Sequence, residues 1–112
     1  MLIKNFDKLD KLTQESTRNA WGETLLALAK KNKDIVVVSA DLAESTRVEN
    51  FGKKYPERFF EVGVAEQNMT GIAAGLALSD KIPCMTSFGV FSPGRNWDQI
   101  RLSICYSKAN VK

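Results

Sequence analysis

Glu66 is the acidic side chain whose surroundings in the sequence are best suited to chemistry. It follows the short apolar segment 59–62 and a glycine, Gly63, and it opens a run of small and apolar residues that extends to Leu78. This pattern predicts a strand, a tight turn and a helix, with the carboxylate at the junction between strand and helix. In open parallel sheets, ligands bind in the crevice beyond the carboxyl ends of the strands. The position of Glu66 therefore predicts contact with a ligand.

A purely structural role for Glu66 is the alternative. A carboxylate in the first turn complements the positive end of a helix, which contributes about 0.3–1 kcal/mol at an exposed site. The helix that follows is rich in small residues, however, so its backbone can approach another element closely. These residues are Gly71, Ala74, Gly75 and Ala77. Close packing leaves the carboxylate little water, and a buried carboxylate without a partner is costly, so we expect another group to meet Glu66.

Histidine is absent from the 112 residues. This excludes metal sites that rely on imidazole and any Ser-His or Cys-His nucleophile formed within the chain. Proton transfer near neutral pH would need carboxylates, a cofactor or residues of another chain. Cys84 and Cys105 lie far apart without metal-type spacing, and we expect both to be reduced thiols packed in the core.

The run from Glu61 to Met69 (Glu-Val-Gly-Val-Ala-Glu-Gln-Asn-Met) resembles the pyrimidine-binding domain of transketolases, in particular the second subunit of transketolases split over two chains. Further matches follow in order: Thr17-Arg18, the Ser-Ala-Asp-Leu segment 39–42, and the aromatic turn and helix in segment 88–101. The resemblance covers the chain from Thr17 onward and is specific as a set. It implies an α/β fold with helices on both faces of a parallel sheet, the thiamine-diphosphate-binding fold of the pyrimidine type.

The resemblance implies thiamine diphosphate as the cofactor. In the family a glutamate hydrogen-bonds a ring nitrogen of the aminopyrimidine and favours the imino tautomer, which takes the thiazolium proton. Glu66 matches that position and is expected to be the catalytic residue. The resemblance also places Phe88 and Phe91 beside the pyrimidine, where an aromatic face can stack on the ring, with Phe91 the stronger candidate. Pro93-Gly94 stands where the family often has an aromatic residue, and ordinary core packing is the alternative for both phenylalanines.

Four further positions match family residues. Asp41 and Leu42 match residues near the thiazolium side of the cofactor, although Asp41 could instead hold a turn or cap a helix. Arg18 and Ser45 match positions that bind the phosphate of a sugar substrate, and a planar guanidinium beside a hydroxyl suits a phosphate dianion. Arg18 also opens a helix, where a cation opposes the helix dipole. This local misfit favours a functional role over that of a solvated arginine.

The chain lacks the Gly-Asp-Gly motif followed by Asn with which the family holds Mg²⁺ and the diphosphate. We therefore expect it to supply half of each site, while a partner chain with the pyrophosphate-binding domain holds Mg²⁺ and supplies the other half. The small-residue helix would line the interface. A homodimer or heterotetramer acting on sugar phosphates is expected, without nucleic-acid or membrane partners.

Alternating helical and strand patterns position these residues. We expect helices over residues 17–32, 46–54, 66–78 and 95–106, and strands over residues 35–38, 59–62 and 82–87. Such alternation indicates a parallel sheet with right-handed crossovers. Trp21, Leu25 and Leu28 should form the apolar stripe of the first helix, and Trp97 should anchor the last one. Residues 1–15 are expected to be a lead-in arm and residues 16–112 the N-terminal portion of the pyrimidine-binding domain. Residues 110–112 should open a fourth strand, and the fold is expected to be incomplete at the C-terminus.

Composition sets the remaining limits. Apolar residues make up 44% and charged residues 26% of the chain, as in ordinary globular proteins. A net charge of +3 is too small and too dispersed to favour a nucleic-acid partner. The sequence carries no signal-peptide pattern, and with reduced cysteines this predicts a cytoplasmic protein.

These features favour a transketolase of the pentose phosphate pathway, which moves a two-carbon ketol unit from a ketose phosphate to an aldose phosphate. The alternatives in the same superfamily are 1-deoxyxylulose-5-phosphate synthase and the β-type subunit of a 2-oxo acid dehydrogenase. The synthase usually has histidine directly after Ala-Glu-Gln, where this chain has Asn68, and it lacks the Ala-Asp-Leu ending found at 40–42. A non-catalytic scaffold subunit of the same fold is the alternative from another class. The presence of Glu66 together with Arg18 favours the enzyme.

Overall fold

The computed structural model describes residues 10, 12 and 14–112. Three parallel strands form one sheet in the order β2-β1-β3. The strands are β1 (Ile35–Ser39), β2 (Phe59–Glu61) and β3 (Ile82–Thr86). This confirms the predicted parallel α/β fold. Most of the expected lead-in arm lies outside the described residues, and the domain boundary at residue 16 stays a prediction.

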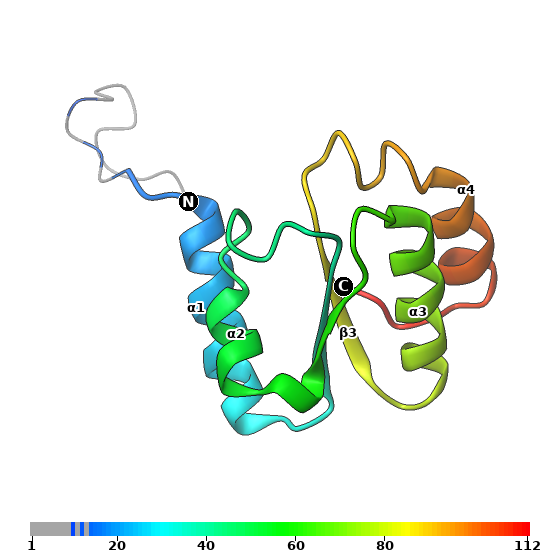
Figure 1. The fold of residues 1–112 in the computed structure, drawn as a ribbon, viewed down its shortest axis with the longest axis horizontal. Helices are drawn as coiled ribbons and strands as arrows, with labels where there is room; N and C mark the ends of the chain where they lie inside the picture. The colour runs from blue at the N-terminus through cyan, green and yellow to red at the C-terminus, as the bar shows by residue number, and fades with distance from the viewer. Residues whose placement is uncertain (1–9, 11, 13) are drawn as a thin grey trace.

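Helices cover both faces of the sheet (Figure 1). One face carries α1 (Thr17–Lys31) and α2 (Glu49–Lys54), and the other carries α3 (Glu66–Leu78). A short helix, α4 (Trp97–Gln99), and the π-helix η3 (Ile100–Tyr106) pack against α3. A single 3₁₀ turn, η2 (Pro56–Arg58), leads from α2 into β2. The helices cover the faces of the sheet, so the connecting loops lie at the two ends of the strands.

The central strand β1 is buried throughout because it is covered on both faces. Successive side chains of a strand point to opposite faces. Val37 accordingly packs with Leu25 and Phe51 on the α1–α2 face, whereas Val38 packs with Met69 on the α3 face. The β-branched run thus forms the shared wall of two cores, as expected for a covered parallel strand.

The buried stripe of α1 differs from the predicted one. Its buried members are Gly22, Leu25 and Ala29, whereas Leu28 is 47% exposed. The reason is a close approach at Gly22, where an added Cβ would lie 2.2 Å from the carbonyl oxygen of Arg47. Glycine allows α1 to press this side against the loop after β1, which rotates Leu28 toward solvent.

The C-terminal helix also differs from its prediction. It begins at Trp97 rather than residue 95 and continues as the π-helix η3. Trp97 is 67% exposed, which contradicts its predicted role as the anchor of this helix, whereas the preceding Asn96 is fully buried. Cys105 is exposed, so its assignment to the core is wrong, but Cys84 is buried and free as predicted. Burial raises the pKa of the Cys84 thiol above its ordinary value.

The last residue lies beside β3. The Lys112 N–H donates to the carbonyl oxygen of Pro83 at 2.9 Å, and the Met85 N–H donates to the carbonyl oxygen of Lys112 at 2.8 Å. This pair of bonds has the arrangement of a parallel ladder. It agrees with the predicted opening of a fourth strand at residues 110–112, on the side of β3 away from β1.

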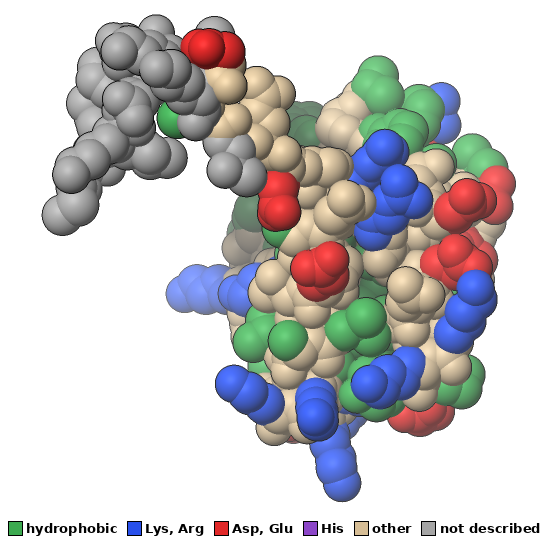
Figure 2. Space-filling view, turned by 90° about the vertical axis from the view of Figure 1, so that its left-hand side faces the viewer, with side chains coloured by type: hydrophobic (Ala, Val, Ile, Leu, Met, Phe, Trp, Pro, Cys, Tyr) green, Lys and Arg blue, Asp and Glu red, His purple; other side chains and the backbone are tan. Residues whose placement is uncertain are grey.

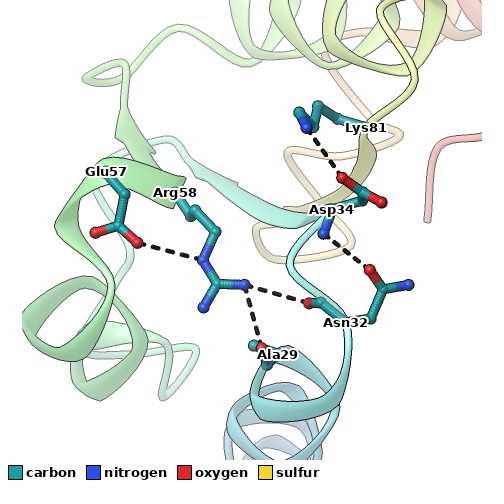
Figure 3. A network of polar contacts seen from close by, with 6 residues as sticks. All are labelled: Ala29, Asn32, Asp34, Glu57, Arg58 and Lys81. Atoms are coloured by element: carbon teal, nitrogen blue, oxygen red, sulfur yellow. Dashed lines mark hydrogen bonds and ion pairs between the residues drawn. The ribbon is translucent and has the colours of Figure 1, made fainter.

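Polar contacts tie together the amino ends of the strands (Figure 3). The Arg58 Nη1 group donates to the carbonyl oxygens of Ala29 and Asn32, both at 3.2 Å. Lys81 pairs with Asp34 at 3.0 Å. Because these residues precede β2, β1 and β3, the network stabilises one end of the sheet and leaves the carboxyl ends free for a site.

The face that carries α1 and α2 has Lys and Arg side chains with Asp and Glu side chains between them (Figure 2). This mixture agrees with the small net charge of +3. Within the described part of the chain, no helix has both the length and the apolar character needed to span a membrane.

Candidate functional site

Glu66 begins α3 immediately after the turn that follows β2, and its side chain is 4% exposed. Gly63 in this turn has φ of 72°, a conformation that glycine adopts without steric cost. The last residue of β2, Glu61, accepts hydrogen bonds at Oε1 from the N–H groups of Asp41 (2.6 Å) and Gly63 (3.1 Å). These bonds join the ends of β1 and β2. The backbone that leads to Glu66 is thereby held in place.

The partner of the buried Glu66 carboxylate is Arg95. Nη1 of Arg95 lies 3.4 Å from Oε1 of Glu66, and its guanidinium carbon lies 4.2 Å from the centroid of the Phe91 ring. The Arg95 side chain is 52% exposed, so solvent screens the pair from one side. Both members of the pair line a cavity of about 530 Å³ at the start of α3. Its other lining residues are Val64, Ala65, Gln67 and Asn68.

Asn96 holds the loop after β3 against α3. Its Nδ2 group donates to Oγ1 of Thr70 at 2.7 Å and to Oγ of Ser92 at 3.0 Å. The Thr70 hydroxyl in turn donates to the carbonyl oxygen of Glu66 at 2.9 Å. The bonds that link Asn96, Thr70 and Glu66 are buried, and they join the loop to the start of α3. It places the neighbouring Arg95 where it can reach Glu66.

Phe88 and Phe91 lie against each other, with ring centroids 6.1 Å apart and an angle of 22° between the ring planes. Phe88 is 41% exposed and Phe91 half-buried, so neither is an ordinary core residue. The strand that precedes this loop is not adjacent to the strand that leads to Glu66, because β1 lies between β2 and β3. The loop reaches Glu66 across the α3 face, through Arg95 and Asn96.

A second cavity of about 550 Å³ lies at the carboxyl ends of β1 and β3. The chain crosses from β1 to β2 through α2 on one face, and from β2 to β3 through α3 on the other face. The direction in which strands are added to the sheet therefore reverses, with the switch between β1 and β3. Such a switch point is a preferred ligand site in open α/β sheets. Six hydroxyl residues line the cavity, together with Arg18, Trp21, Met85 and Phe88. The hydroxyl residues are Ser16, Thr17, Ser45, Thr46, Thr86 and Ser87.

Arg18 and Ser45 are brought together in this second cavity. The Arg18 Nη1 group donates to the backbone carbonyl oxygen of Ser45 at 3.4 Å. Arg18 is exposed and Ser45 half-buried. The guanidinium therefore keeps N–H groups available to an anion beside the hydroxyls of the cavity wall.

Asp41 and Leu42 are turn residues and lie outside the lining of both cavities. Asp41 is exposed with φ of 60°, and its N–H bonds to Glu61. The carbonyl oxygen of Leu42 accepts a hydrogen bond from Thr46 Oγ1 at 2.7 Å. The geometry therefore gives Asp41 the turn role that was its alternative, and contact of either residue with a thiazolium stays a prediction.

Sequence reasoning missed Arg95, Asn96 and the role of Glu61. The signal available for the first two was their place directly after Pro93-Gly94. An added Cβ at Gly94 would lie 1.9 Å from the carbonyl oxygen of Val90. The loop thus requires glycine at this position, and Arg95 and Asn96, which follow it, reach α3.

The comparisons with known proteins agree with this architecture. Residues 13–112 match the transketolase pyrimidine-binding domain. The chain belongs to that family.

Similar proteins include one from Methanocaldococcus jannaschii named as a transketolase C-terminal section, with 53% identity over 95 residues, or 85% of this chain and 30% of that protein. A 6-deoxy-6-sulfo-D-fructose transketolase subunit from a Clostridium species is 43% identical over 91% of this chain and 32% of its own length. A solved structure described as a split-gene transketolase, inactive β4 tetramer, superposes with a TM-score of 0.79 at 49% identity, covering 88% of this chain and 33% of that one. The chain thus spans about a third of the length of these relatives.

Proposed function

We propose that the chain supplies the pyrimidine-binding half of a thiamine diphosphate site in a transketolase. The enzyme would transfer a two-carbon ketol unit from a ketose phosphate to an aldose phosphate. The observation that carries this proposal is the Glu66 carboxylate, which is 4% exposed and lines a cavity at the start of α3. Membership of the transketolase pyrimidine-binding family supports it.

The groups around Glu66 fit an aminopyrimidine. A buried carboxylate can share a proton with a weakly basic ring nitrogen, and an aromatic face can stack on the ring. Arg95 already bridges such a pair, since its planar guanidinium contacts both Glu66 and the Phe91 ring. A flat nitrogen-containing group is thus compatible with the space between the two residues.

When bound, thiamine diphosphate supplies the chemistry of a thiazolium ylid. Glu66 would hold a proton at the ring nitrogen of the pyrimidine and so favour the imino tautomer of the exocyclic amine. The held turn at Gly63 and the low exposure of the carboxylate limit its motion and its hydration. Both properties favour proton sharing with a weak base over solvation.

The second cavity is suited to the phosphate of a sugar substrate. Arg18 offers a guanidinium, and Ser45 belongs to a wall of hydroxyls, which together match the geometry of a phosphate dianion. Phe88 lines this cavity and stacks on Phe91, whose ring also contacts Arg95 of the first cavity. The aromatic pair therefore connects the two cavities.

The proposal includes a partner chain that holds Mg²⁺ and the diphosphate and acts with this chain as a dimer or heterotetramer in the cytoplasm. The similar solved structure is described as an inactive β4 tetramer, which supports the need for a second kind of subunit. The carbohydrate reaction would belong to the pentose phosphate pathway.

1-Deoxyxylulose-5-phosphate synthase is a second candidate function. An enzyme of that name from Clostridium kluyveri is 37% identical over 81% of this chain. Asn68 after Ala-Glu-Gln and the Ala-Asp-Leu segment at 40–42 favour transketolase instead.

The test is Glu66→Gln in the full-length protein reconstituted with its partner. Ketol transfer should fall about 10²- to 10⁴-fold, the usual contribution of a positioned acid–base group. Glu57→Gln is the matched control, because the Glu57 side chain is 68% exposed, and it should leave the rate unchanged. Unchanged transfer in Glu66→Gln would instead support the non-catalytic scaffold.

A further inference from the structure

We propose that Arg95 is an internal substitute for the aminopyrimidine. When no cofactor is bound, the Arg95 guanidinium takes the place of the ring beside Glu66 and Phe91, and it leaves when the cofactor binds. This inference rests on the proposed role of Glu66. It assigns to Arg95 a competitive role that limits the affinity of the site for the cofactor.

The contacts of the Arg95 guanidinium are the ones proposed for the ring. One edge directs an N–H to Oε1 of Glu66 at 3.4 Å, and its carbon lies 4.2 Å from the centroid of the Phe91 ring. A guanidinium is planar and delocalised, and it stacks on aromatic faces as a heterocycle does. Two planar groups cannot occupy the same space between Glu66 and Phe91, so the ring and the guanidinium exclude each other.

The pair also explains how a carboxylate can be so deeply buried. Leaving Glu66 charged at 4% exposure without a partner would be strongly unfavourable. Arg95 is the basic residue that lines the same cavity, and it compensates this charge. The charged carboxylate is therefore held beside the guanidinium until a group that can hydrogen-bond to it takes the place of Arg95.

Arg95 can withdraw without rearranging the fold. Its side chain is 52% exposed, so the guanidinium can reach solvent by a change of rotamer. The next residue, Asn96, is fully buried and bonded to Thr70 and Ser92, which holds the backbone while the side chain moves. The exchange thus needs the motion of one side chain.

Only molecules in which Arg95 does not block the site can bind the cofactor. The apparent affinity for the cofactor is therefore reduced in proportion to the fraction of molecules in which the site is open. The ion pair is half-exposed, so it should favour the blocked form only modestly. Removing the guanidinium should therefore tighten cofactor binding.

The test compares Arg95→Met with the control Arg101→Met in the full-length protein with its pyrophosphate-domain partner. Arg101 is exposed and lies in η3. The Kd of thiamine diphosphate with Mg²⁺, measured by titration calorimetry, should fall about fivefold in Arg95→Met and stay unchanged in Arg101→Met. Circular dichroism melting verifies that each variant is folded. Arg95→Lys, which keeps the charge but not the planar group, should give an intermediate Kd. This variant replaces Arg95→Met in the test if Arg95→Met does not fold.

A double-mutant cycle with Glu66→Gln separates this inference from the proposed function. In the Glu66→Gln background, Arg95→Met should change the Kd by about twofold at most, because a neutral amide no longer holds the guanidinium. An unchanged or weaker affinity in Arg95→Met would overturn the substitute role while leaving the role of Glu66 intact. If Glu66→Gln alters neither cofactor binding nor transfer, the proposed function itself fails.

Discussion

The burial of Glu66 follows from local features that are visible in the sequence. A glycine turn brings the chain from β2 into a helix of small residues, and the carboxylate at the junction is 4% exposed. Its partner could not be foreseen in the same way. Arg95 lies 29 residues further along the chain. Pro93-Gly94 marks a turn before it, but the path of this loop toward α3 depends on contacts between distant segments.

Arg18 is the residue at which the proposed substrate site can be tested. Arg18→Ala should raise KM for phosphorylated sugars about 10- to 100-fold, because a charge-assisted hydrogen bond contributes about 1.5–3 kcal/mol. An unphosphorylated acceptor of the same sugar should keep its KM. Steady-state kinetics with the two acceptors measures the difference, with Arg101→Ala as the exposed control. An equal loss for both acceptors would show that Arg18 does not recognise the phosphate.

At the level of elements, the sequence predicts best where start and stop signals are strong. The helix predicted over residues 66–78 is α3 with the same bounds, and α1 ends one residue before its prediction. The final helix is less predictable, because its start is set by the burial of Asn96 against Thr70 rather than by a cap in its own sequence. The stripe of α1 is displaced for a similar reason, the non-local contact of Gly22 with Arg47.

The loop that delivers Arg95 depends on Gly94. Gly94→Ala should lower the free energy of unfolding by about 1–3 kcal/mol, because its Cβ would lie 1.9 Å from the carbonyl oxygen of Val90. Gly75→Ala in α3 has open space around its Cβ within this chain, and in the protein without its partner it should raise this free energy by about 0.5–1 kcal/mol through helix propensity. Urea denaturation measures both. An unchanged or higher free energy of unfolding in Gly94→Ala would contradict the close approach at Gly94.

For the whole molecule, the sheet divides into two ends with different roles. The amino ends of the strands are held by the contacts of Arg58, Asp34 and Lys81, and the carboxyl ends carry both cavities. The order β2-β1-β3 could not be obtained from the sequence, because strand order depends on pairing between distant segments. Gly71 and Gly75 on α3 are exposed, which agrees with the proposed interface along this helix.

If this chain supplies only the pyrimidine-binding half of the cofactor site, binding of the cofactor should depend on the partner. The full-length protein without its partner should show no saturable binding of thiamine diphosphate up to roughly 1 mM, because the proposed function assigns the groups that hold Mg²⁺ and the diphosphate to the partner. Addition of the partner should bring binding into the micromolar range. Titration calorimetry measures both states. Micromolar binding without the partner would contradict the half-site.

The most direct measurement is a crystal structure of the full-length protein and its partner with thiamine diphosphate bound. We expect a Glu66 carboxylate oxygen about 2.6–3.2 Å from a ring nitrogen of the aminopyrimidine, with Arg95 displaced from the carboxylate. A pyrimidine bound elsewhere, or a Glu66 carboxylate beyond hydrogen-bonding distance of the ring, would contradict it.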